Sequence, residues 1–284
     1  MIGSVLNMII LLHHRFNDTT SILLLNLSVA DFFVSSANLL GKIPSVLFPY
    51  YPKAADDIFC FYMIYILVPN QTCIFISIYF VTLVAIVRTV AVTLPFRVSS
   101  LITRFRVRLV SVIGAAAIIC LDSPFFNMFR TVEFTFVDDN YTARFLSHTT
   151  YFTDNEEALD VYGLTYGLIV SNLIPIVIIA VCTVMIITSI TKNWNTLKKL
   201  SSTESKIRIK EMKSAKTSLA VSISMMVTVL LPSFVFEMVG MFQSNLYPSS
   251  AVHLIVDEIM SLVYQSNSSF NFIIYVATSP KFAK

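Results

Sequence analysis

The sequence predicts an all-α protein that crosses a membrane as a bundle of seven helices. Of its 284 residues, 56% are hydrophobic and 13% are charged, whereas a soluble domain has about twice that share of charged residues. The apolar residues gather in long stretches, and an α-helix needs about 20 such residues to span a bilayer. We expect helices because a helix satisfies its own backbone hydrogen bonds where no water reaches.

The predicted helices follow one another along a single domain of residues 1–284. The first stretch, Met1–Leu12, is shorter than a full span and is interpreted as the end of a first helix. Polar linkers separate the later stretches, and no internal repeat relates them. Six further helices are expected at residues 21–48, 58–90, 107–126, 161–190, 214–242 and 251–276.

Charge is distributed unevenly between the linkers. The first, third and fifth linkers hold most of the lysines and arginines, including the arginines between Arg88 and Arg108. The acidic residues belong to the opposite side except for Asp18, Asp31, Glu204 and Glu211. The positive-inside rule then places the N-terminus outside and the C-terminus in the cytoplasm, which requires an odd number of spans. The net charge of +3 is too small to indicate a nucleic-acid partner.

A few polar side chains lie deep within the predicted helices. Asp31 is the acid near the middle of a span, and Ser77 lies midway along the third helix. Asn267 and Asn271 are one helical turn apart on the seventh. Hard oxygen ligands of this kind suit a small cation such as sodium. The alternative is a set of hydrogen bonds that fixes the packing of the helices.

Motifs spread over the whole chain resemble those of rhodopsin-like (class A) G-protein-coupled receptors. They are Asn26-Leu-Ser-Val-Ala-Asp31, Arg88 followed by Pro95, Pro175, Pro232, Asn267-Ser-x-x-Asn271-x-x-x-Tyr275, and Phe282 at the start of an amphipathic eighth helix. Leu94-Pro-Phe-Arg-Val is similar to the corresponding segment of invertebrate, especially molluscan, chemosensory-type or peptide-type receptors.

The resemblance implies a multi-pass receptor of the plasma membrane that is not an enzyme. Such a receptor binds an extracellular ligand, a small chemosensory molecule or a peptide, and activates a heterotrimeric G protein. Arg88 would contact the G protein with Tyr275 and Pro95 nearby, and Pro175 and Pro232 would kink their helices. The resemblance places Asp31, Ser77, Asn267 and Asn271 at the family's sodium site, and no other cofactor is implied.

The resemblance also places the ligand pocket at the outer halves of the helices. Asn70 and Gln71 occupy third-helix positions that face the ligand in the family. Amine receptors carry an aspartate where Asn70 stands, so an ammonium would find no carboxylate there. The other expected wall residues are Lys42, Ser171, Phe234, Glu237, Asp257, Ser261, Tyr264 and Gln265. Lys42 would alternatively form a structural ion pair with Glu237 or Asp257.

Several positions depart from the family's pattern. Val87 and Thr89 replace the usual neighbours of Arg88, and Met212 lies near the foot of the sixth helix. The ionic lock of the inactive state is therefore expected to be absent and the basal activity high. Cys60 has no partner in the second outer loop, so we expect no disulfide there. That loop contains the plausible glycosylation site, Asn140.

Two other functional classes fit the composition less well. A transporter or channel would need a continuous polar path, repeats or broken glycine-rich helices, and the chain has only 6 glycines. An intramembrane protease would need a second aspartate near Asp31 or histidines within the spans. His13, His14, His148 and His253 all lie in or beside linkers.

Overall fold

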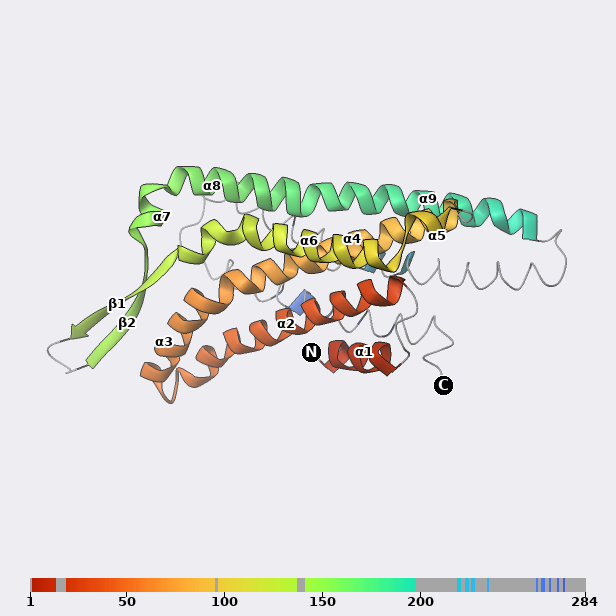
Figure 1. Cartoon of the computed structure of the whole chain (residues 1–284). Coiled ribbons are helices and arrows are strands. Elements are labelled where there is room, and N and C mark those ends of the chain that lie inside the picture. Colours follow the sequence, from red (N-terminus) through yellow and green to blue (C-terminus); the bar gives the residue numbers. More distant parts are fainter. Residues whose placement is uncertain are drawn as a thin grey trace.

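The computed structural model describes residues 2–13, 19–94, 97–136 and 141–197, and beyond these only scattered helical residues between 219 and 273. Within these ranges the protein is an elongated bundle of helices from which one β-hairpin projects (Figure 1). The first half contains α1 (Ile2–His13), α2 (Thr19–Leu47), α3 (Pro52–Phe61), η1 (Tyr62–Ile66) and α4 (Leu67–Thr93).

A short helix and a second long helix follow, and then the hairpin and a third helical stretch. These elements are α5 (Val98–Leu101), α6 (Arg104–Asp122), η2 (Ser123–Asn127), β1 (Phe129–Phe136), β2 (Tyr141–His148), α7 (Thr150–Asp154), α8 (Glu156–Leu164), η3 (Thr165–Leu173) and α9 (Ile174–Leu197). We call the end of the bundle near β1 and β2 the hairpin end. The arginine end carries α5 and Arg88, Arg97, Arg104, Arg106 and Arg108.

Four helical stretches in the described ranges are long and apolar enough to cross a bilayer. They are Thr19–Leu47, Pro52–Thr93, Arg104–Asn127 and Glu156–Ser189, and α1 contributes a shorter apolar helix, Ile2–Leu12. The protein is therefore a multi-pass membrane protein. The helices expected at 214–242 and 251–276 lie almost entirely outside the described residues, so the count of seven remains a prediction.

The core lies around α4, which contacts α2, α6 and α9. The largest fully buried apolar side chains of these helices are Leu23, Leu27, Ile78, Val81, Val84, Ile179 and Ile186. On the outer surface of α6, by contrast, Val112 and Ile113 are more than half exposed. Such exposure costs nothing in lipid, because hydrocarbon tails are as apolar as these side chains.

Two spans contain a wider π-helical segment followed closely by a proline. Pro69 follows η1, and Pro175 follows η3. A proline has no N–H, so the carbonyl four residues earlier loses its α-helical partner. These carbonyls belong to Tyr65 and Ser171, which lie inside the two π-helical segments. The lost bond gives a physical reason for the change in winding at these places.

The segment expected as a plain linker between the fourth and fifth spans forms an antiparallel hairpin of β1 and β2. Glu133 and Arg144 are cross-strand partners, and Arg144 Nε lies 3.0 Å from Glu133 Oε1. Arg144 Nη1 also lies 3.1 Å from Asp57 Oδ1, which ties the hairpin to α3. The hydrogen bond to Glu133 and the charge of Asp57 raise the pKa of Arg144.

Three predicted helix starts were too late by three residues or more. The helix expected from residue 58 begins at Pro52, where a proline at the first turn is favourable. The helix expected from 107 begins at Arg104, because Thr103 Oγ1 caps it by accepting from the Arg106 N–H at 3.3 Å. The helix expected at 161–190 spans 156–197, and its first turn contains acidic residues, which suit a helix N-terminus.

Candidate functional site

Asp31 and Ser77 face each other in the middle of the bundle. Asp31 comes from α2 and is 7% exposed, and Ser77 comes from α4 and is 3% exposed. Ser77 Oγ donates to Asp31 Oδ1 at 2.6 Å. The distance is typical of a charge-assisted hydrogen bond, which is stronger than a neutral one. This bond therefore joins α2 to α4 at a depth where water does not compete.

A second polar link joins the same two helices nearer the hairpin end. Asn70 Nδ2 donates to Asn38 Oδ1 at 2.8 Å. Asn38 is seven residues after Asp31, and Asn70 is seven residues before Ser77, so both links lie on one face of each helix, two turns apart. The two pairs thus define a single antiparallel register between α2 and α4.

The predicted pocket residues divide between the interior and the surface. Asn70 is 8% exposed, and its Oδ1 has no hydrogen-bond partner among the described residues, so this acceptor remains available. Gln71 is exposed and belongs to another face of α4. Ser171 is buried in η3, and Lys42 of α2 and Phe234 are half-buried. The pocket as a whole remains a prediction.

The structure also buries an acid that sequence reasoning had assigned to the outer side. Asp122 ends α6 and is only 3% exposed, beside Thr72 of α4 and Tyr166 of η3. Thr72 Oγ1 donates to the carbonyl oxygen of Val68 at 3.0 Å. The Asp122 carboxylate interacts with the Thr72 and Tyr166 side chains, but Asp122 Oδ2 and the Tyr166 hydroxyl form no hydrogen bond of regular geometry in the part of the chain that the structure describes.

The burial of Asp122 agrees with its place on one face of α6. The buried residues of α6 are Val107, Ser111 and Asp122. Their spacings of four and eleven residues place them on one face of a helix, because three turns take about eleven residues. Asp122 therefore belongs to the face that meets α4, although it lies near the end of its span.

At the arginine end, α4 is attached to α9 through backbone carbonyls. Thr89 Oγ1 donates to the carbonyl oxygen of Ala85 at 2.8 Å and also lies 3.5 Å from that of Cys182 in α9. Ser189 Oγ of α9 lies 3.4 Å from the carbonyl oxygen of Val92. Arg88 is half-buried on this part of α4, eleven residues after Ser77. Its neighbours in the sequence are Val87 and Thr89, neither of which carries a charge, so the absence of the ionic lock stays a prediction.

The remaining predicted site residues lie outside the described residues. They are Pro95, Asn140, Pro232, Glu237, Asp257, Ser261, Tyr264, Gln265, Asn267, Asn271 and Tyr275. Met212 and Phe282 also lie outside the described residues. Within the described part, no group of three or more His, Cys, Asp or Glu is placed to hold a metal. Of the four residues predicted to form the sodium site, the described part contains Asp31 and Ser77, whose oxygen atoms are hydrogen-bonded to each other.

A family model described as 7 transmembrane receptor (rhodopsin family) matches residues 4–275. The chain belongs to this family. It is therefore a class A receptor of the G-protein-coupled type, which agrees with the resemblance of its motifs and with its apolar helices. No curated protein matches this receptor. Membership of this family does not favour the alternative function of a transporter or channel.

Cys60 of this receptor is buried and unpaired. Its thiol lies 3.7 Å from the carbonyl oxygen of Arg144 in β2, so the contact between α3 and the hairpin is noncovalent at this point. Cys73, Cys120 and Cys182 are also free in the described structure. The expected absence of an outer-loop disulfide remains a prediction for mass spectrometry of the intact protein.

Proposed function

We propose that this receptor binds an extracellular ligand at the hairpin end and, in response, promotes nucleotide exchange on a heterotrimeric G protein at the arginine end. The N-terminus would be outside and the arginine end in the cytoplasm of a cell at its plasma membrane. The bond between Ser77 and Asp31 carries the proposal. It lies between the two ends, on the helix that also bears Arg88, and so would relate ligand binding to the conformation around Arg88.

The proposed switch site combines Asp31 and Ser77 with Asn267 and Asn271 of the predicted seventh helix. A carboxylate, a hydroxyl and two amides present the oxygen ligands that a small hard cation prefers. A sodium ion there would bind more tightly to one conformation than to another and so shift the equilibrium between them. Tyr275 and Pro95 would act with Arg88 at the G-protein surface, and Pro232 would kink the sixth helix.

The proposed ligand is a small chemosensory molecule or a peptide with hydrogen-bond donors. Asn70 Oδ1 is a buried acceptor at the depth expected of the pocket. Asp154, Glu156, Glu157 and Asp160 are exposed near the hairpin end. Their charge favours the approach of cationic ligands by long-range attraction. Glu237, Asp257, Ser261, Tyr264 and Gln265 would complete the wall, and Asn140 would carry a glycan on the same side.

The decisive experiment measures basal nucleotide exchange, because the expected absence of the lock predicts activity without a ligand. Membranes containing the receptor are mixed with purified heterotrimeric G protein, and binding of a non-hydrolysable GTP analogue is followed. We expect exchange above that of receptor-free membranes and its loss in Arg88→Ala. Arg130→Ala is the matched control, since Arg130 is an exposed arginine of β1 at the opposite end.

Two results would contradict the proposal. One is exchange that is equal in Arg88→Ala and in the unaltered receptor, with both expressed at the membrane. The other is a transmembrane ion flux that needs no G protein, which would instead support the class of channels and transporters.

A further inference from the structure

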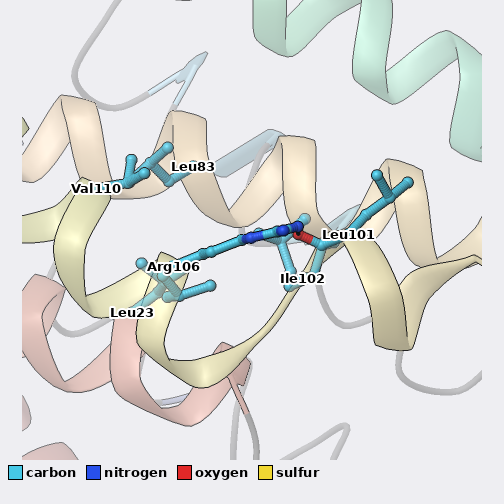
Figure 2. A pocket seen from close by; sticks show the side chains of 8 residues that line it. Leu23, Leu83, Leu101, Ile102, Arg106 and Val110 are labelled. Carbon is cyan, nitrogen blue, oxygen red and sulfur yellow. Dashed lines mark hydrogen bonds between the residues drawn. The ribbon is translucent and has the colours of Figure 1, made fainter.

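A small cavity opens at the arginine end between four elements of the fold (Figure 2). Its volume is about 160 Å³. With one exception its lining side chains are apolar: Leu23 of α2, Leu83 and Val87 of α4, Leu101 and Ile102 at the end of α5, and Val107 and Val110 of α6. The exception is Arg106 of α6. The cavity therefore suits a hydrocarbon chain with a negative group at one end.

Arg106 crosses the cavity toward α5, as Figure 2 shows. Its Nη1 donates to the carbonyl oxygens of Ser100 at 2.8 Å and Leu101 at 3.2 Å. Its Nε and Nη2 donate no hydrogen bond within the described part of the chain. A guanidinium that is held at one nitrogen and open at the others matches the geometry of a phosphate group.

The surroundings of the cavity mouth carry positive charge. Arg97, Arg104 and Arg108 are all exposed near Arg106. The sequence from residue 93 to residue 121 contains no Asp or Glu, so this segment carries a net positive charge. Leu101 and Val110 on the cavity wall are 47% and 45% exposed, which leaves an apolar opening beside the charged one.

We propose that this cavity is a binding site for an anionic phospholipid of the cytoplasmic leaflet. A short length of one acyl chain would enter between Leu83 and Val110, and the phosphate would accept hydrogen bonds from Arg106. A bound lipid would also contact Leu101 and Ile102 and so hold α5 against α6. The inference rests on the proposed cytoplasmic position of the arginine end, where anionic lipids are concentrated. It does not require that the receptor activate a G protein.

The test measures lipid binding directly on the full chain. The purified receptor is placed in nanodiscs of phosphatidylcholine with a minor fraction of phosphatidylserine, and the lipids that stay bound after release are counted by native mass spectrometry. We expect phosphatidylserine to be retained in preference to phosphatidylcholine. Arg106→Gln should lower its retention about tenfold, because the bound phosphate loses charge-assisted hydrogen bonds to the guanidinium.

Matched variants separate this site from general attraction to a charged surface. Arg108→Gln removes the same charge from an exposed neighbour that does not line the cavity, and it should lower retention clearly less than Arg106→Gln does, because only the general attraction to the charged surface is lost. Val110→Phe fills the cavity and should also lower retention, whereas Val112→Phe enlarges an exposed side chain on the same helix and should not. Val110→Phe keeps the test valid if Arg106→Gln fails to fold.

Several outcomes would overturn the proposal. Equal retention of the two phospholipids would do so, as would equal losses in Arg106→Gln and Arg108→Gln. Displacement of phosphatidylserine by cholesterol at equal concentration would assign the cavity to a sterol instead. If the receptor shows nucleotide exchange but no preference for phosphatidylserine, the lipid proposal fails and the proposed receptor function stands. If it retains phosphatidylserine but shows no nucleotide exchange, the proposed receptor function fails and the lipid site stands.

Discussion

The two faces of α4 are held to their neighbours by different means. Toward α2, the face carries Ser77 and Asn70, and both form side-chain hydrogen bonds across the interface. Toward α6, the contact depends on shape, because the Tyr79 ring lies directly against Gly114. The Tyr79 hydroxyl adds a hydrogen bond to the carbonyl oxygen of Val110 at 2.9 Å.

This difference reflects the two ways in which helices associate in lipid. Apolar side chains gain little by leaving hydrocarbon, so either polar bonds or the close approach of small residues must hold the helices together. The most apolar window of Arg104–Asn127 is only 11% buried, against 50% for that of Thr19–Leu47. We conclude that α2 and α4 form the firm part of the bundle and that α6 is attached at its edge.

The largest effect is expected at the polar interface. Ser77→Ala removes the donor to Asp31 and should lower the free energy of unfolding by about 2 kcal/mol, because a buried charged acceptor loses this hydrogen bond. Thermal melting of the purified receptor in detergent measures this. The control is Ser28→Ala, since Ser28 is equally buried but donates only to the carbonyl oxygen of Leu24 in its own helix. An equal loss in the two variants would show that the Ser77–Asp31 bond contributes nothing specific.

The same melting curves examine the proposed sodium site. Sodium chloride should raise the melting temperature relative to choline chloride, because an ion that binds only the folded state stabilises it. Ser77→Ala should reduce that difference.

An intermediate effect is expected at the shape-dependent interface. In Gly114→Ala the new methyl group would overlap the tip of the Tyr79 ring, which must swing away and lose its bond to Val110. The expected destabilisation is about 1 kcal/mol. In the control, Gly163→Ala, the added carbon would lie 3.2 Å from Phe125 Cζ and needs only a small shift. If the two variants lower the melting temperature equally, the Tyr79–Gly114 contact has no special role.

The smallest effect, with the opposite sign, is expected at the buried end of α6. Asp122→Asn keeps the shape of the side chain but removes a charge that has no cationic partner among the described residues. The receptor should become more stable at pH 7 by about 0.5–1 kcal/mol. Asp160→Asn, on the exposed face of α8, should leave the melting temperature unchanged. A lower melting temperature for Asp122→Asn would indicate that the carboxylate has a favourable partner.

The sequence predicts much of the bundle because hydropathy and length alone locate a span. Thr19–Leu47 was expected at 21–48 on that basis. Asp31 and Ser77 were identified as deep polar residues by their position within the spans, but their hydrogen bond depends on the register of two helices. Asp122 was missed because its neighbours, Thr72 and Tyr166, are distant in sequence.

The hairpin and the π-helical segments were also absent from the sequence-based prediction. The alternation of apolar and polar residues in Val132-Glu-Phe-Thr-Phe136 is typical of a strand. The pairing of the two strands and their place on the bundle depend in addition on the contacts of Arg144 with Glu133 and Asp57. The π-helical segments precede Pro69 and Pro175, but a proline alone does not specify how the helix before it adjusts.

The shared register of the Asp31–Ser77 and Asn38–Asn70 pairs has a mechanical consequence. A slide of one helical turn, about 5.4 Å, or a rotation of α2 against α4 would break both bonds at once, and no intermediate position preserves either. Because both bonds would be lost together, we expect the two helices to move as one body in a change of state. Displacements that open the arginine end then have to be taken up elsewhere, and the widened turns before Pro69 and Pro175 are places where the backbone already departs from regular winding.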